Sequence, residues 1–298
     1  MPQLYYVFSP EDFPLSFGLG LYAPYGLALD WGQNTPFWTV AEKGSLLYLC
    51  VNPVIAWKIH PKLSIAIGPT INYSEADFQR GIGVVQNDSF RLKGDGWAYG
   101  FNAGVRWQPI EKLAFGINYR SATTVDYEGT AETSIPGVFS GTTSATAGIK
   151  FPQFVVGGVS FRPTENWNFE FDIDWADWDT VKQITIQNLP PIALNYKSSF
   201  MYEVGATRQL GKGYFASLGF FYSENSSPDQ NFNPAIPDTD LYLGSAGFGY
   251  KGKHWDWTVG YQFGYNPGRE VTGDVNQSAN GTYHVLNHAF NIAATFKF

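Results

Sequence analysis

Histidine, serine, cysteine and carboxylate side chains are the first candidates for chemistry, and in this chain they do not form a catalytic pattern. The four histidines, His60, His254, His284 and His288, lie in or beside expected turns, and no nucleophile motif surrounds them. Acyl-transfer enzymes need a nucleophile, a base and an orienting carboxylate or carboxamide. The sequence therefore predicts that the protein is not an enzyme.

Metal and cofactor chemistry is also not indicated. Cys50 is the single cysteine in 298 residues, which excludes an intramolecular disulfide and a multi-cysteine metal site. We expect it to be a small apolar residue in a strand. No glycine-rich phosphate loop or metal-ligand spacing occurs, so the sequence predicts no metal and no cofactor. The net charge of -7 gives no support for nucleic-acid binding, which usually requires a basic patch.

The charged residues that remain fall on one face of expected strands. Arg106 and Arg120 share this face with four carboxylates, Glu170, Asp172, Asp174 and Asp256. A guanidinium can bind a ligand carboxylate through its two-pronged donor geometry. It can equally pair with carboxylates of the protein, and we keep both interpretations of Arg106 and Arg120.

The elements that carry these residues are strands with two different faces. In Leu113–Arg120 the odd positions are large and apolar and the even ones small or polar, which is the period of a strand. The same alternation in other parts of the chain predicts twelve strands. They cover roughly 14–22, 45–59, 63–77, 95–108, 112–127, 150–162, 167–178, 199–209, 213–225, 240–251, 255–266 and 286–298.

Composition indicates that the apolar faces meet lipid. Charged residues make up only 15% of the chain and aromatic residues 17%, whereas a soluble domain carries about 25% charged residues. No apolar run reaches the roughly 18 to 20 residues that a membrane-spanning helix needs. A very aromatic soluble β-protein and a membrane barrel remain as the two options.

The connections between the strands favour the barrel. Short turns such as 60–62 and 108–111 alternate strictly with long connections such as 79–94 and 128–149. Outer-membrane barrels have short periplasmic turns and long external loops. The predicted fold is all-β, an antiparallel transmembrane β-barrel of about twelve strands covering residues 14–298. Loop 128–149, rich in Ser, Thr, Gly and Ala, is expected to be mobile or loosely folded.

Residues 1–13 are expected to be a short lead segment before the barrel. They lack the basic and apolar regions of a secretory signal, which an outer-membrane protein needs. The chain is therefore expected to be a processed form, a fragment or a mis-started product. The alternating strand at the other end closes on Phe298, as in the signal that the barrel assembly machinery recognises.

Two expected external loops are unusually apolar. Such side chains can hold acyl chains of varied length without strict specificity. They can also simply pack on each other to cap the barrel, and we leave both interpretations open. The candidate capture residues are Phe78, Ile82, Val84, Val85, Phe90, Leu92, Ile135, Val138 and Phe139.

Nearly the whole chain resembles the FadL/TodX (OMPP1) family of outer-membrane transporters for hydrophobic compounds. The resemblance is carried by the order and spacing of several segments and not by one motif. They are Leu15–Leu27, Asn52–Ile59 followed by Lys62–Ile65, Gly96–Pro109, Gly116–Ser121, Asp172–Trp178, and Pro228–Asp229 with Ile236–Asp240.

The resemblance implies a fourteen-stranded barrel with an N-terminal hatch, external loops that capture substrate, and a sideways exit at a kinked strand. The hatch and the first hairpin have no counterpart here, which leaves twelve strands. Gly18 and Gly20 lie in the strand that matches the kinked one, and glycine often marks a bulge or bend. We expect a lateral opening there, with glycines that merely smooth the barrel interior as the alternative.

The resulting prediction is passive uptake of hydrophobic compounds, most of all long-chain fatty acids, across the bacterial outer membrane. The expected partners are these molecules, outer-membrane lipid and lipopolysaccharide, and the barrel assembly machinery. A diffusion porin for small polar solutes is the alternative, and a structural or adhesive surface barrel is a third possibility. The apolar loops favour uptake of hydrophobic compounds over the porin.

Overall fold

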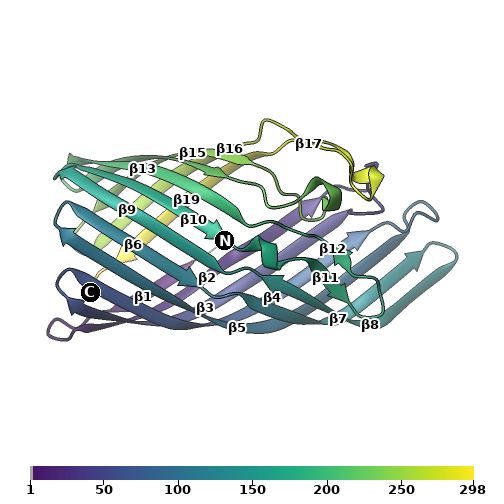
Figure 1. The fold of residues 1–298 in the computed structure, drawn as a ribbon, viewed down its shortest axis with the longest axis horizontal. Helices are drawn as coiled ribbons and strands as arrows, with labels where there is room; N and C mark the ends of the chain where they lie inside the picture. Colours follow the sequence, from purple (N-terminus) through teal and green to yellow (C-terminus); the bar gives the residue numbers. More distant parts are fainter. Residues whose placement is uncertain (1–2) are drawn as a thin grey trace.

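The computed structural model describes residues 3–298, and long antiparallel strands form most of it (Figure 1). All twelve expected segments are strands. The wall consists of β1 (Leu4–Phe8), β2 (Leu15–Asp30), β3 (Lys43–His60), β4 (Leu63–Arg80), β5 (Ser89–Ile110), β6 (Leu113–Arg120), β9 (Phe154–Thr164), β10 (Trp167–Ala176), β13 (Ser199–Gly211), β14 (Tyr214–Ser223), β15 (Leu241–Lys251), β16 (Trp255–Tyr265) and β19 (Leu286–Phe296). Within residues 3–298, no helix has the length and apolar character required to cross a membrane.

Each wall strand pairs with the next one along the wall, in the order β1-β2-β3-β4-β5-β6-β9-β10-β13-β14-β15-β16-β19. Every pair is antiparallel, and β1 and β19 are the two edges of the sheet. The two edges meet where the Tyr6 and Phe298 rings stack with centroids 6.1 Å apart. No backbone ladder joins β1 to β19 within the described residues. Residues 4–8, part of the expected lead segment, therefore contribute a strand to the wall.

Alternation along the strands separates an apolar exterior from a polar interior. On β6, Phe115 and Ile117 point outward and are 38% and 59% exposed. Their neighbour Asn118 lies on the opposite face, where its side chain is close to Gly104 of β5. Outward Trp97 and Trp107 are ten residues apart on β5, about the length of strand that crosses a bilayer, as expected for the two aromatic girdles of a membrane barrel. The predicted inside and outside faces are confirmed.

The strands join through very short turns at one end of the barrel. Two or three residues suffice between β3 and β4, β5 and β6, β9 and β10, β13 and β14, and β15 and β16. The turn between β13 and β14 uses positive φ angles at Gly211, Lys212 and Gly213, which suits a tight hairpin connection. The other end carries the long connections, so the predicted alternation is confirmed.

The prediction that residues 128–149 form a loosely folded loop is wrong. They belong to a regular hairpin, β7 (Thr123–Ile135) and β8 (Phe139–Phe151), which continues β6 and β9 beyond the wall. Threonine recurs through both strands, and its branched side chain favours extended structure. The hairpin extends the sheet at the long-loop end (Figure 1).

The remaining long connections also contain short regular elements. They are β11 (Gln183–Ile186), β12 (Ile192–Ala193), β17 (Arg269–Val271), β18 (Gly281–Tyr283) and the 3-10 turns η1 (Trp178–Thr180), η2 (Asp229–Asn231) and η3 (Gln277–Ala279). Arg269 ties two of these connections together. Its guanidinium donates to Ser227 O at 2.7 Å, Asp238 O at 2.6 Å and the Asp229 carboxylate at 2.7 Å.

Apart from small register shifts beside the short turns, the ladder of the wall is interrupted at three places in the described residues. The β2–β3 register shifts between Tyr22 and Tyr25, and the β3–β4 register has a gap between Val51 and Ile55. In that gap Asn52 Nδ2 donates to Pro69 O at 2.8 Å, so a side chain replaces a ladder bond that proline cannot supply. The third interruption separates β6 from β7 and β8 from β9.

Candidate binding site

An apolar cavity of about 380 Å³ lies at the long-loop end of the barrel. The inner faces of β4, β5, β7 and β8 form its wall, and the segments 184–192 and 233–236 cover it. Its apolar lining is Val40, Ala76, Phe78, Phe90, Leu92, Tyr127, Ala145, Ala147, Ile149, Ile184, Ile186, Leu189, Pro190, Ile192, Ala235 and Ile236. Concave apolar cavities with few polar groups are typical small-molecule sites.

The cover of this cavity is held by strand pairing. β11 extends the sheet by pairing with β8, with Ile186 opposite Ala147. This pairing turns Ile184 and Ile186 into a buried apolar cluster with Val181, which Leu92 and Ile149 contact from the wall. The cavity is thus built into the sheet and does not depend on a flexible loop alone.

The structure places only some predicted capture residues at the cavity. Phe78, Phe90 and Leu92 line it. Val84 and Val138 are instead 61% and 74% exposed at loop tips, and Val85 and Phe139 are exposed beside them. Ile82 and Ile135 are partly buried, and neither belongs to the cavity lining.

The tip residues lie next to each other although they do not reach the cavity. Ser89 pairs with Ser134, which places the 81–88 connection beside the β7–β8 turn. Asp88 organises that connection because its fully buried carboxylate accepts the backbone N–H groups of 82, 83, 84 and 85 at 2.6 to 3.2 Å. Burial acts to raise the pKa of Asp88, but these four bonds prevail and lower it to about 2.

Arg80 is a cavity residue that the sequence prediction missed. It lines the cavity at the end of β4, donates to Thr39 O at 3.1 Å and lies over the Phe90 ring at 5.4 Å. Its side chain is solvent-exposed, and its guanidinium forms no ion pair within residues 3–298. The alternation Ala76, Phe78, Arg80 carried this signal, but the expected strand ended at 77.

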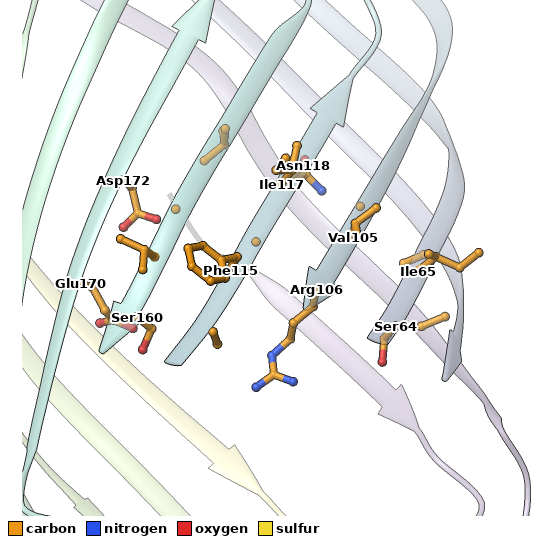
Figure 2. Close-up of a pocket in the computed structure, with 18 residues that line it drawn as sticks. Ser64, Ile65, Val105, Arg106, Phe115, Ile117, Asn118, Ser160, Glu170 and Asp172 are labelled. Carbon is orange, nitrogen blue, oxygen red and sulfur yellow. The ribbon is translucent and has the colours of Figure 1, made fainter. Parts of the chain in front are cut away.

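Arg106 lies far from the apolar cavity, in a second cavity of about 530 Å³ toward the short-turn end. Figure 2 shows Arg106 on β5 and Glu170 and Asp172 on β10, with β6 and β9 between them. No ion pair joins Arg106 to either carboxylate in the described part of the chain, and its guanidinium donates to Gln108 at 2.8 Å. The expected lumen pairing is therefore not formed.

Arg120 lies between the two cavities. Its guanidinium donates to Tyr22 Oη at 3.1 Å and stacks over the same ring at 5.1 Å. Asn52 and Asn102 are hydrogen-bonded to each other at 2.7 Å in the same polar layer, and buried Cys50 faces it from β3. Arg120 can offer charge to a ligand only if its contact with Tyr22 changes.

Gly18 and Gly20 lie in a regular part of the wall. Gly18 pairs with Val7 on one side and Val54 on the other, and Gly20 is likewise paired on both sides. The interruption of β2 follows at Ala23 and Pro24. Any opening near these glycines would have to use this neighbouring irregularity.

Comparisons with known proteins identify the relatives of this chain. Residues 1–298 match the family described as outer membrane protein transport protein (OMPP1/FadL/TodX). A long-chain fatty acid transport protein of Escherichia coli O6:H1 is 21% identical over 84% of this chain, which spans 66% of that protein. Outer membrane protein P1 of Haemophilus influenzae is 20% identical over 84% of this chain and 62% of its own length.

Solved structures of the same fold agree with the barrel. A FadL homologue from Pseudomonas aeruginosa superposes with a TM-score of 0.86 at 17% identity, covering 99% of this chain and 77% of its own. The toluene transporter TbuX of Ralstonia pickettii gives 0.74 at 16% identity, covering 99% and 80%. The apolar exterior of the wall and the alternation of short and long connections are consistent with the family match over the full chain. The chain belongs to the OMPP1/FadL/TodX family of outer-membrane transport proteins.

Proposed function

We propose that the protein takes up long-chain fatty acids from outside the cell by passive binding in the external cavity. The observation that carries the proposal is Arg80, a cation that lines a mainly apolar cavity, in which Lys93 is the second lining cation. A fatty acid combines a long apolar tail with one carboxylate. This cavity offers one surface for each part.

The apolar lining accounts for affinity. Each buried methylene group of a tail contributes roughly 0.8 kcal/mol. Phe78, Phe90 and Leu92 contribute side chains to the lining, and Arg80 has guanidinium donors left after its bond to Thr39 O. A carboxylate can accept two parallel bonds from such a group. This arrangement favours a fatty acid over a neutral aromatic hydrocarbon, which has no carboxylate to bind the guanidinium.

The names of the related proteins do not decide between a fatty acid and an aromatic hydrocarbon. Those matched by sequence include proteins named for long-chain fatty acid transport, and those matched by structure include toluene transporters. Arg80 is what supports the fatty acid for this chain.

The exit is proposed to be lateral, near Gly18 and Gly20. Two ladder interruptions, at Ala23–Pro24 and at Pro53, lie in the same part of the wall and support it. The second cavity supports it too, because Arg106, Glu170 and Asp172 make the axial route polar. An apolar tail gains nothing from displacing the water around those charges.

The test compares two ligands in one variant. In a transporter-deficient strain, Arg80→Gln is expected to lower labelled oleate uptake at limiting concentration by about tenfold, the low end for a charged hydrogen bond, because the guanidinium is solvent-exposed. Toluene uptake should not change. Arg91→Gln is the matched control, since Arg91 lies one strand away, next to Asp77 and outside the cavity lining. An equal loss for both ligands would refute the fatty-acid assignment.

The polar second cavity favours one other function, a porin for small polar solutes. Arg106 faces carboxylates across it without pairing, as in a water-filled channel. A large, steady ionic current through the wild-type protein in planar bilayers would support the porin over fatty-acid uptake. Contacts with lipopolysaccharide and with the assembly machinery stay predictions.

A further inference from the structure

One side chain crosses the interior of the barrel. Tyr25 belongs to β2, yet its hydroxyl donates to Pro152 O, between β8 and β9, at 3.2 Å. Four strands, β3, β4, β5 and β6, separate β2 from β9 in the wall. Tyr25 therefore links opposite sides of the lumen and does not merely contact a neighbouring strand.

Tyr25 is the centre of a group of aromatic rings. Its ring centroid lies 5.1 Å from Tyr48, 4.8 Å from Phe151 and 6.2 Å from Trp178. Tyr48 and Phe151 are 2% and 4% exposed, and Tyr48 Oη lies 2.7 Å from Thr123 Oγ1. We call Tyr25, Tyr48, Phe151 and Trp178 the septum.

Two irregularities of the wall put the septum together. Between Tyr22 and Tyr25 strand β2 has one residue more than its partner β3, where Cys50 and Tyr48 are the matching positions. A bulge of this kind redirects the side chain that follows it, so Tyr25 points inward together with Tyr22. Pro152 interrupts the passage from β8 to β9, which leaves its carbonyl free to accept from Tyr25.

The septum lies between an apolar environment and a polar one. Tyr127 and Ile149 belong both to the apolar cavity above and to the packing around Tyr48. Below lies the polar layer of Tyr22, Arg120 and Asn52. The polar groups of the septum are two phenols, which are already hydrogen-bonded, and the indole N–H of Trp178.

We propose that the septum is the barrier that keeps ions and polar solutes from crossing the barrel, and that Tyr25 closes it. A hydrated ion would have to shed its water to pass between buried rings, which costs far more than thermal energy. An apolar chain loses nothing there, so the same barrier lets the cargo of the external cavity through when the rings move apart. The wall of the barrel itself thus supplies selectivity.

Ion conductance of the full chain in planar lipid bilayers tests the proposal. Tyr25→Ala and Phe151→Ala remove rings from opposite walls, and each is expected to produce stepwise currents that the wild type lacks. Tyr25→Phe removes only the bond to Pro152 O and is expected to stay closed, because ring packing persists. Tyr99→Ala is the matched control: Tyr99 is an outward tyrosine, 73% exposed, on β5.

Folding of each variant is checked by its heat-dependent shift in gel mobility, and having one variant on each wall allows for one that fails to fold. Closed channels in both folded alanine variants, or equal currents in Tyr99→Ala, would overturn the proposal. The proposal rests on the proposed function only for the nature of the cargo. No fatty acid enters the conductance measurement, so failure of the Arg80 experiment and failure of the septum are separate results.

Discussion

Asp88 shows how a single carboxylate fixes the shape of an external loop. It accepts four consecutive backbone N–H groups and so keeps Val84 and Val85 at the surface. An amide has only one oxygen to accept these bonds. We predict that Asp88→Asn speeds hydrogen exchange at 82–85 at neutral pH, measured by mass spectrometry. Glu128→Gln, at an exposed carboxylate farther along the β5–β7 ladder, should leave that exchange unchanged.

The same carboxylate predicts an acid-sensitive loop. Its pKa, about 2, lies below the ordinary carboxyl value of about 4, so the stabilisation is complete above pH 4 and is lost as the pH falls toward 2. Limited pepsin digestion should cut the wild-type loop increasingly across this range. The Asp88→Asn variant should be cut throughout it, and identical profiles for the two proteins would contradict the prediction.

For single residues, the sequence predicted part of the apolar lining of the external cavity but did not predict Arg80. Phe78, Phe90 and Leu92 were predicted for the capture site and line the cavity. Arg80 was missed because the expected strand ended three residues too early. Tyr25 could not have been found by alternation, because the extra residue at Ala23–Pro24 changes which face it occupies. Which side chains reach across a lumen depends on curvature that no local pattern records.

Among the elements, the strands were predictable and the external segments were not. Strands repeat every two residues and leave a clear signal, whereas β7 and β8 were hidden by small polar residues that are also common in loops. Their β-branched threonines indicated strands, but the apolar alternation was weak. The connections 225–239 and 267–285 are joined by Arg269, which lies 31 to 42 residues from its partners in sequence.

Arg269 gives a prediction for these connections. Its side chain is 8% exposed, whereas that of its partner Asp229 is 46% exposed. When Arg269 is replaced, the carboxylate that remains can therefore be hydrated. We expect Arg269→Met to destabilise the 225–239 connection by about 2 kcal/mol, below the usual loss for a fully buried pair. Hydrogen exchange of that segment measures the effect. The stability of the segment in Arg269→Lys should lie between that of the wild type and that of Arg269→Met, because lysine keeps the charge but loses the planar donor array.

Across the whole molecule, the low fraction of charged residues reflects a barrel wall with an apolar outer face and a polar inner face. Ile117 and Asn118 are neighbours on β6 and lie on opposite faces of the wall, Ile117 toward lipid and Asn118 toward the interior. We predict that Ile117→Lys destabilises the folded barrel by about 2 to 4 kcal/mol in liposome unfolding experiments, since it puts a charge near the middle of the bilayer. Asn118→Lys should be close to neutral, and similar losses at both positions would contradict the assignment of faces.

The sole thiol of the chain has a practical consequence for such experiments. Cys50 is 2% exposed on the inner side of β3, where maleimide reagents have little access to its sulfur. A Val138→Cys substitution, at a position 74% exposed in the turn of the β7–β8 hairpin, would therefore take a fluorophore at one defined position without a cysteine-free background. The native protein is already suited to single-site spectroscopy of its outermost hairpin.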